Sequence, residues 1–387
     1  MSDNKNRTFR EFERCLNITG ETKTFISNSV CSKIPAFLMG CLLQKLSREA
    51  LDEGKGELNM SQWIETVQSF FNCPESEADS LSAAQYESGK AGKKSSTRSK
   101  HKTCLIDVGG GLRGVYAGGV LERLMDEDIQ VDLCIGVSAG SANLATYIAR
   151  QKGRLYAYYH EYGYRQEYAS IHNYLTKRSF FDMDYIYGTL SNSDGEYPLD
   201  YPAMMASPTQ LITVATNALT GRPVYLGKEW MRQDDYALIK GSCSVPYLCT
   251  TNNIANIPFC DGTVSDPIPV QKALEMGADR IAILFPRPVE EDKPGKAMEL
   301  TIELAAHFSQ YGRTFPAVYD ALKVRMDKNN ESLRLALKLQ EEGKLLFVFP
   351  KTLHDVKSLG GSPEAVQALY DEGYQDGRKA ADFLLQP

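Results

Sequence analysis

A serine held between small residues is the feature of this sequence that most directly indicates chemistry. The segment GVSAG places Ser138 between Gly136 and Gly140. An apolar run of strand length, residues 131–135, precedes the segment, and a helical pattern over residues 141–150 follows it. In a sharp strand-to-helix turn the two glycines leave space that side chains would fill, and the serine hydroxyl lies beside the positive end of the helix. The pattern therefore predicts a nucleophile elbow, with a tight packing turn as the alternative.

A glycine-rich segment, GGGLRG, precedes the serine in the chain. It contains Gly109, Gly110 and Gly111, and Arg113 stands two residues further on. Successive backbone N–H groups in such a loop can surround an anion. If Ser138 attacks an ester, these groups form an oxyanion hole for the tetrahedral intermediate, and Arg113 steadies the loop or adds positive potential.

The same segment matches the GxGxxG pattern of dinucleotide-binding folds. Its glycines stand at Gly109, Gly111 and Gly114, after a predicted strand and before a predicted helix. Such folds place an acidic residue at the end of the second strand. Here Asp132 falls at the beginning of that strand, and the strand ends in the segment of Ser138. The pattern therefore favours hydrolysis, and a nucleotide-binding protein is kept as an alternative.

An aspartate in the segment PFCDGTVSDPIPV is the candidate base. Asp261 ends a short apolar run and is followed by Gly262, so its carboxylate can face a site. A carboxylate in contact with Ser138 could accept the serine proton. Asp266 is the fallback, and a simple Asp-Gly turn is the alternative to any chemical role.

Two histidines allow a second hydrolase interpretation. His307 and His354 follow Asp261, which gives the chain order Ser–Asp–His of α/β-hydrolase triads. His354 comes directly after an apolar run, KLLFVFP, where a triad histidine could stand. An esterase with a Ser–Asp–His triad is therefore the alternative to a pair of Ser138 and Asp261 alone.

These residues lie in a region where predicted strands alternate with predicted helices. The apolar runs of strand length cover residues 104–108, 132–137, 211–219, 279–286 and 344–350. Helical patterns cover residues 115–127, 141–150 and 363–385. This alternation predicts an α/β domain with a mostly parallel sheet.

The composition is that of a globular protein and excludes several classes. Of the 387 residues 43% are apolar and 24% are charged, which excludes a wholly disordered chain, and the net charge of -6 argues against a general nucleic-acid binder. No run approaches the roughly 20 apolar residues of a membrane span, and the polar start MSDNKNRTFREFERC shows no signal peptide. Nine cysteines without a CxxC pair and five histidines without HExxH indicate reduced thiols, a cytoplasmic protein and no metal site.

The chain divides into three parts by composition. Residues 1–86 have short helical patterns and predict a small helical accessory region. Residues 87–103 have six Lys and Arg against one Glu and no large apolar side chain, so we expect a flexible linker. Peripheral contact of this linker with an anionic membrane surface is the alternative. Residues 104–387 carry the motifs and form the predicted catalytic domain.

Taken together, residues 104–380 resemble the patatin-like phospholipases. That family combines a GGGxRG loop, a GxSxG elbow and a downstream DG[GA] aspartate, which correspond here to GGGLRG, GVSAG and Asp261-Gly262. This sequence departs from the pattern in two places. Val108 precedes the glycines where an acidic residue is usual, with Asp107 one position earlier, and Thr263 replaces the small third residue of the aspartate motif.

The resemblance implies a fold and a reaction. The fold would be a three-layer sandwich around a mostly parallel sheet. The reaction would be hydrolysis of the fatty-acyl esters of lipids or phospholipids by a Ser–Asp dyad without histidine, metal or cofactor. Ser138 would be the nucleophile and Asp261 the base, while Gly110 and Gly111 would donate N–H groups to the oxyanion with support from Arg113.

Overall fold

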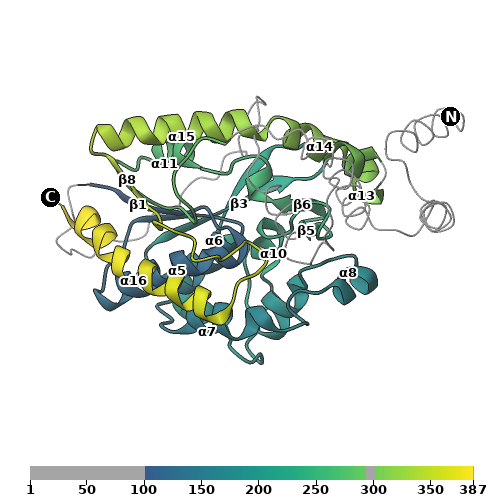
Figure 1. Cartoon of the computed structure of the whole chain (residues 1–387), viewed down its shortest axis with the longest axis horizontal. Coiled ribbons are helices and arrows are strands. Elements are labelled where there is room, and N and C mark those ends of the chain that lie inside the picture. The colour runs from purple at the N-terminus through teal and green to yellow at the C-terminus, as the bar shows by residue number, and fades with distance from the viewer. Residues whose placement is uncertain (1–100, 293–301, 308, 387) are drawn as a thin grey trace, which may run out of the picture.

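The computed structural model describes residues 101–292, 302–307 and 309–386 (Figure 1). The helical accessory region predicted for residues 1–86 lies outside these residues, as does nearly all of the linker predicted for residues 87–103.

An eight-stranded mixed sheet forms the centre of the domain, with the order β5-β6-β3-β2-β1-β7-β8 and β4 paired to β3. Five strands run parallel: β1 (Thr103–Asp107), β2 (Leu133–Val137), β3 (Gln210–Asn217), β7 (Arg280–Leu284) and β8 (Leu345–Val348). Antiparallel pairs extend the sheet beyond β3: β4 (Pro223–Gly227) and β6 (Ile257–Asp261) pair antiparallel with β3, and β5 (Asn252–Ile254) pairs antiparallel with β6. The parallel strands are the five predicted ones, and the antiparallel extension was not predicted.

Helices cover both faces of the sheet (Figure 1). One face packs against α5 (Val115–Asp126), α6 (Ala139–Ile148) and α16 (Pro363–Leu385), and the other packs against α11 (Val270–Glu275) and α15 (Arg325–Glu341). Successive residues of β1 therefore alternate between two apolar cores: Leu105 lies in the first, and Cys104 and Ile106 lie in the second. Burial on both faces explains why the parallel strands are continuous apolar runs. The arrangement confirms the predicted α/β fold class.

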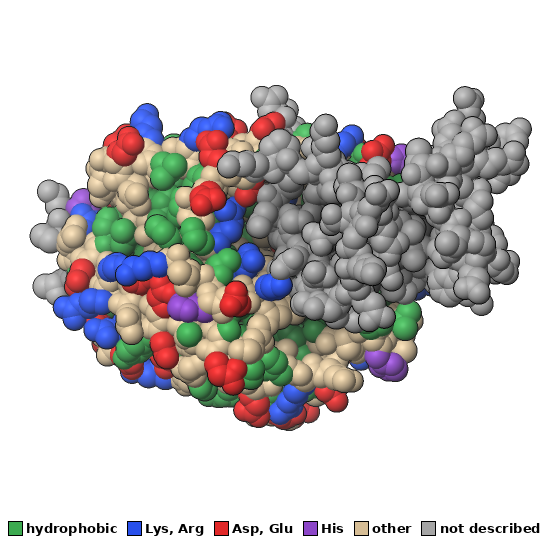
Figure 2. Space-filling model, viewed as in Figure 1, with side chains coloured by type: hydrophobic (Ala, Val, Ile, Leu, Met, Phe, Trp, Pro, Cys, Tyr) green, Lys and Arg blue, Asp and Glu red, His purple; other side chains and the backbone are tan. Residues whose placement is uncertain are grey.

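Further α-helices have five to eight residues each. They are α7 (Arg154–His160), α8 (Ile171–Lys177), α9 (Tyr201–Ala206), α10 (Ala237–Ser242), α13 (Gln310–Thr314) and α14 (Pro316–Lys323). Within the described ranges, no helix is long and apolar enough to cross a membrane. Acidic and basic side chains are interspersed over the face that Figure 2 shows.

The first helix of the domain and the last one cross at glycines. A Cβ added to Gly119 of α5 would lie 2.1 Å from the carbonyl oxygen of Tyr370, and one added to Gly373 of α16 would lie 2.1 Å from that of Tyr116. The buried hydroxyl of Tyr116 also donates a hydrogen bond of 2.9 Å to Asp376. Because the backbones touch, the C-terminal helix is held closely against the helix that follows the glycine-rich segment.

Gly373→Ala should destabilise the domain by about 1–3 kcal/mol, because the new methyl group forces the two backbones apart. Denaturant unfolding followed by circular dichroism measures this change. Gln375→Ala, at an exposed position of the same helix, is the matched control and should change stability by less than about 0.5 kcal/mol. Equal effects of the two substitutions would contradict the close approach of α5 and α16.

Candidate active site

The register of the sheet brings the predicted site residues to one edge. Asp107 at the end of β1 pairs with Gly136, so the glycine-rich segment and the serine turn leave the sheet side by side. Val137 pairs with Val214 of β3, and the next residue of β3 pairs with Asp261. Ser138 and Asp261 therefore flank the same point of β3, one on each side.

Ser138 stands in a strained turn between β2 and α6. Its backbone has φ 53° and ψ −133°, a conformation that non-glycine residues rarely adopt. The turn is possible because its neighbours lack side chains. A Cβ at Gly136 would lie 2.5 Å from Cα of Ser141, and one at Gly140 would lie 2.1 Å from the carbonyl oxygen of Asp107. The predicted strand–turn–helix geometry is therefore present, with the serine at the N-terminus of α6.

The side chains of Ser138 and Asp261 are in direct contact. The hydroxyl of Ser138 donates a hydrogen bond of 2.7 Å to Oδ2 of Asp261. The other carboxylate oxygen, Oδ1, accepts bonds from the backbone N–H (2.8 Å) and the hydroxyl (2.7 Å) of Thr263. Asp261 is 0% exposed and Ser138 is 9% exposed, so the contact is buried on the aspartate side and reaches the surface of the cavity only at the serine.

Burial changes the basicity of Asp261. Removal of the carboxylate from water raises its pKa above the ordinary aspartate value, while the hydrogen bonds from Ser138 and Thr263 and the charge of Arg325 oppose this rise. The raised pKa makes this aspartate a stronger base than one in water.

A second serine that the sequence analysis did not single out fixes the turn. Oγ of Ser242, at the end of α10, accepts the backbone N–H of Ser138 at 2.9 Å and donates to the carbonyl oxygen of Val214 at 2.6 Å. The hydroxyl of Ser141 lies 3.0 Å from Oγ of Ser242. Because these contacts connect segments far apart in the chain, no local motif signals them.

The glycine-rich segment has positive φ angles at Gly109, Gly110 and Gly111, which only glycine adopts readily. The N–H of Gly109 donates to Oδ1 of Asp107 at 2.9 Å, and that of Leu112 donates to the carbonyl oxygen of Ser358 at 2.8 Å. Within the described residues, no such hydrogen bond uses the N–H groups of Gly110 and Gly111. Both residues line the cavity.

Asp107 joins the glycine-rich segment to the serine turn. Its Oδ2 accepts a bond of 2.9 Å from the side-chain amide of Asn143 in α6, and Asn143 in turn accepts the hydroxyl of Tyr159 at 3.0 Å. Burial raises the pKa of Asp107 to about 6. The sequence did offer a signal here, because Asp107 stands one position before the place where the resembling family has an acidic residue.

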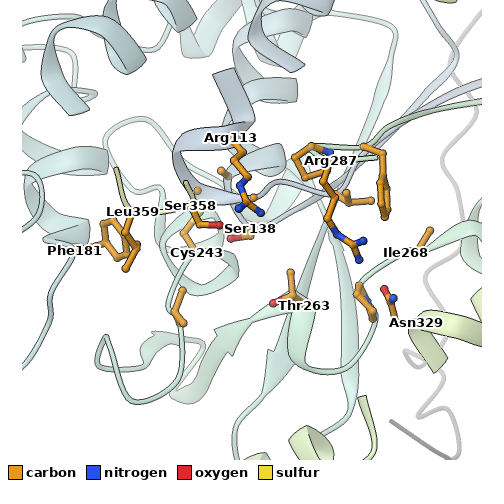
Figure 3. Close-up of a pocket in the computed structure, with 18 of the residues that line it drawn as sticks. Arg113, Ser138, Phe181, Cys243, Thr263, Ile268, Arg287, Asn329, Ser358 and Leu359 are labelled. Carbon is orange, nitrogen blue, oxygen red and sulfur yellow. The ribbon is translucent and has the colours of Figure 1, made fainter. Parts of the chain in front are cut away.

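Arg113 lies in the wall of the cavity near Ser138 (Figure 3). Its Nε donates a bond of 3.2 Å to the carbonyl oxygen of Val356, in the segment between β8 and α16. Burial and the nearby charge of Arg287 lower its pKa. The C-terminal part of the chain thus holds both Arg113 and, through Ser358, the glycine-rich segment.

The cavity at Ser138 has two chemically different sides (Figure 3). Its volume of about 120 Å³ is far larger than the roughly 10–15 Å³ that one water molecule needs. On one side of the serine lie Phe181, Cys243 and Leu359. On the other side lie Ile268, Arg287 and Asn329. Further apolar lining residues come from the segments around Phe181 and Cys243: Tyr168, Met183, Ile186, Tyr187 and Val245.

The structure does not bring the alternative acids and bases to Ser138. His354 interacts with Glu372 at 2.7 Å, and Nδ1 of His307 interacts with the carbonyl oxygen of Glu303. No described residue that lines the cavity is a histidine. Asp266, the fallback base, accepts the hydroxyl of Tyr225 at 2.6 Å.

The acidic residue considered for dinucleotide binding lies at the opposite edge of the sheet. Asp132 accepts bonds from the backbone N–H and the hydroxyl of Thr103, at the start of β1. The end of β2 carries Ser138 instead of a carboxylate. The arrangement that favours nucleotide binding is therefore not formed around the glycine-rich segment.

An α/β fold with a strained serine turn at its strand ends defines the structural class, and comparison with known proteins points to a family. Residues 108–274 match the family model described as patatin-like phospholipase, so this part of the chain is similar to that family. The match confirms the resemblance and is shorter than the predicted range of 104–380. Residues 315–386 match a second model, described as a domain of unknown function, DUF6363.

Individual relatives add little about function. The chain is 30% identical to the uncharacterized protein YjjU of Escherichia coli (strain K12) over 199 residues, which cover 47% of this chain and 51% of that protein. The chain thus spans about half the length of this curated relative. The crystal structure of VipD from Legionella pneumophila is similar with a TM-score of 0.35 and 14% identity, over 73% of this chain and 67% of that chain. The fold class rests on the sheet itself.

The raised pKa of Asp107 predicts a pH-dependent cost in stability. Its pKa of about 6 in the folded state exceeds the value of about 3.9 expected in the unfolded chain. The folded state therefore binds more protons between about pH 4 and pH 6, and the contribution of this group to stability falls as pH rises through that window. Asp107→Asn removes this dependence, so the stability of the variant relative to wild type should improve by on the order of 2 kcal/mol from pH 4 to pH 7.

Chemical unfolding at several pH values measures the difference. Asp355→Asn removes one exposed carboxylate and serves as the control for net charge. If the difference in unfolding free energy between Asp107→Asn and wild type does not change with pH, a raised pKa of Asp107 is contradicted.

Proposed function

We propose that the protein hydrolyses acyl esters of lipids with Ser138 as the nucleophile and Asp261 as the base. The observation that carries this proposal is the buried hydrogen bond of 2.7 Å between the two side chains, at the edge of a cavity. A serine hydroxyl becomes an effective nucleophile when an adjacent base takes its proton. Asp261 is the only described acid or base whose side chain touches that of Ser138.

In the first half of the reaction, Ser138 attacks the ester carbonyl and Asp261 accepts the serine proton. The bond between the carbonyl carbon and the leaving oxygen then breaks, and Asp261 returns the proton to the departing alcohol or lysolipid. The strained conformation of Ser138 and the hydrogen bond from its N–H to Ser242 hold the nucleophile in place during the attack.

In the second half, water releases the fatty acid from Ser138. Asp261 is again unprotonated and takes a proton from the attacking water, and the same proton then returns to Oγ of Ser138. Thr263 keeps the carboxylate oriented throughout, because it donates two hydrogen bonds to the oxygen that does not face the serine. No metal or cofactor takes part in these steps.

The N–H groups of Gly110 and Gly111 are the proposed donors to the oxyanion. They line the cavity, and no described hydrogen bond already uses them. The N–H of Gly109 donates to Asp107, so we assign Gly109 to the shape of the loop instead of to the oxyanion itself. Arg113 adds positive charge beside the loop, since it also lines the cavity.

The apolar side of the cavity suits an acyl chain, because it is lined by aromatic and aliphatic side chains such as Phe181 and Leu359. A lipid held in a bilayer or micelle also requires contact with its surface. Leu175 of α8 is 59% exposed and Ile171 is 36% exposed, and the chain leads from this helix directly to Phe181. We propose peripheral contact with a lipid surface at this helix.

A fluorophosphonate probe should label wild-type protein at Ser138 and not the Ser138→Ala variant. Mass spectrometry of tryptic peptides locates the label. Ser193→Ala, which changes an exposed serine, is the control and should be labelled like wild type. Asp261→Asn should lower the rate of ester hydrolysis by about 10²–10⁴-fold, because an amide cannot take the serine proton. Full activity of folded Ser138→Ala would exclude the proposed nucleophile.

Thr263→Val should move the acidic limb of the pH–rate profile to higher pH. The hydroxyl of Thr263 donates to the ionised carboxylate and so lowers the pKa of Asp261. Without this hydrogen bond the pKa of Asp261 rises, so Asp261 becomes protonated and inactive at a higher pH. The dependence of kcat/KM on pH, which reports ionisations of the free enzyme, measures this shift. A shift toward lower pH, or none, would mean that another group controls the acidic limb.

A further inference from the structure

Among the described residues that line the cavity, arginines outnumber acidic side chains. Three arginines line the cavity: Arg113, Arg287 and Arg325. Among the described lining residues the acid is Asp292. Guanidinium groups at the wall of a cavity suit an anionic part of a ligand.

Arg287 is held in a defined position. Its Nη2 forms an ion pair of 2.7 Å with Asp292, and its guanidinium group lies 5.1 Å from the centre of the Phe285 ring. Asp292 in turn accepts the side-chain amide of Asn329 at 2.9 Å. Nη1 of Arg287 also donates a hydrogen bond of 3.4 Å to the carbonyl oxygen of Glu290. A guanidinium group has five N–H donors in a rigid fork, so these two bonds leave further donors for a ligand.

Arg325 and Asn329 approach the same space from α15. Arg325 is the first residue of this helix and is only 5% exposed, and Asn329 lies about one turn further on. Both residues line the cavity. Figure 3 shows Asn329 beside Arg287, on the side of Ser138 opposite Phe181 and Leu359.

We propose that Arg287, Arg325 and Asn329 form a subsite for the phosphate group of the lipid substrate. The subsite rests on the proposed function, and it narrows the substrate class to esters with a negatively charged phosphate head group. The ester carbonyl would lie at Ser138, the acyl chain against Phe181 and Leu359, and the phosphate against the arginines.

The chemistry of the subsite favours an anionic head group over a zwitterionic one. Arginine binds phosphate oxygens through parallel hydrogen bonds, and Asn329 can donate through its amide. A choline group would add a positive charge beside Arg287 and Arg325, where Asp292 is already engaged by Arg287. Lysophosphatidic acid and phosphatidylglycerol fit this charge distribution better than phosphatidylcholine.

The two regions matched by family models would then have separate roles. Ser138 and Asp261 lie in the patatin-like residues 108–274, whereas Arg325 and Asn329 lie in residues 315–386. The C-terminal region, together with Arg287 from the segment between the two matches, would thus select the head group for a reaction that the first region performs.

The experiment compares substrates that differ only in the head group. Lysophosphatidic acid, lysophosphatidylcholine and monoacylglycerol, all with an oleoyl chain, are hydrolysed by wild type and by Arg287→Met, and kcat/KM is measured for each. The ratio of lysophosphatidic acid to monoacylglycerol should fall about tenfold or more in the variant. Arg334→Met, on the same helix as Arg325 but 63% exposed, is the control and should keep the ratio within about twofold.

A second variant tests whether the effect of Arg287→Met arises from misfolding. Arg287→Met leaves the buried carboxylate of Asp292 without its cation, so the double variant Arg287→Met, Asp292→Asn removes both charges together. It should show the same loss of preference for lysophosphatidic acid. An unchanged ratio in either folded variant, or a wild-type preference for lysophosphatidylcholine over lysophosphatidic acid, would overturn the subsite.

Binding without turnover separates this proposal from the proposed function. Ser138→Ala protein is titrated calorimetrically with glycerol 3-phosphate, inorganic phosphate and glycerol. Glycerol 3-phosphate should bind most tightly, and adding Arg287→Met should weaken it about tenfold or more. Equal binding of inorganic phosphate would indicate a site for the free anion and overturn the head-group assignment. If wild type hydrolyses none of the esters while this binding pattern holds, the proposed function fails and the phosphate site stands.

Discussion

The close approach of two backbones at the C-terminal edge of the sheet sets the geometry of the whole site. The chain at Gly140 passes so near the end of β1 that a single Cβ would lie 2.1 Å from the carbonyl oxygen of Asp107. This contact forces the serine turn and the glycine-rich segment together. It also holds Ser138 in a strained conformation with positive φ, which the hydrogen bond from its N–H to Ser242 and the packing of Gly136 maintain.

The same edge concentrates buried polar groups that belong to different parts of the chain. Asp107 links the glycine-rich segment to α6, and Ser242 links the serine turn to β3. The segment between β8 and α16 then closes the arrangement, because the carbonyl oxygens of Val356 and Ser358 hold Arg113 and Leu112. Nearly every polar group near Ser138 thus has a partner that fixes its position, which is the condition for a preorganised site.

Contiguous motifs allowed the sequence to predict the centre of this site, but not its surroundings. The five parallel strands, the helix Pro363–Leu385 and the positions of Ser138 and Asp261 followed from local patterns. The strands β4 to β6 are short and four of the five residues of β4 are only partly buried, so their hydrophobic periodicity is weak. Arg287 and Arg325 are isolated in sequence. Only the fold shows that they border one cavity with Ser138.

A crystal structure of the protein after reaction with an alkyl fluorophosphonate would test the central claim most directly. The account predicts a covalent bond from Oγ of Ser138 to phosphorus, with the phosphoryl oxygen within about 3.1 Å of the N–H groups of Gly110 and Gly111. The alkyl chain should lie against Phe181 and Leu359. A phosphoryl oxygen turned away from the glycine-rich segment, or a bond to any residue other than Ser138, would contradict the proposed arrangement of nucleophile and oxyanion donors.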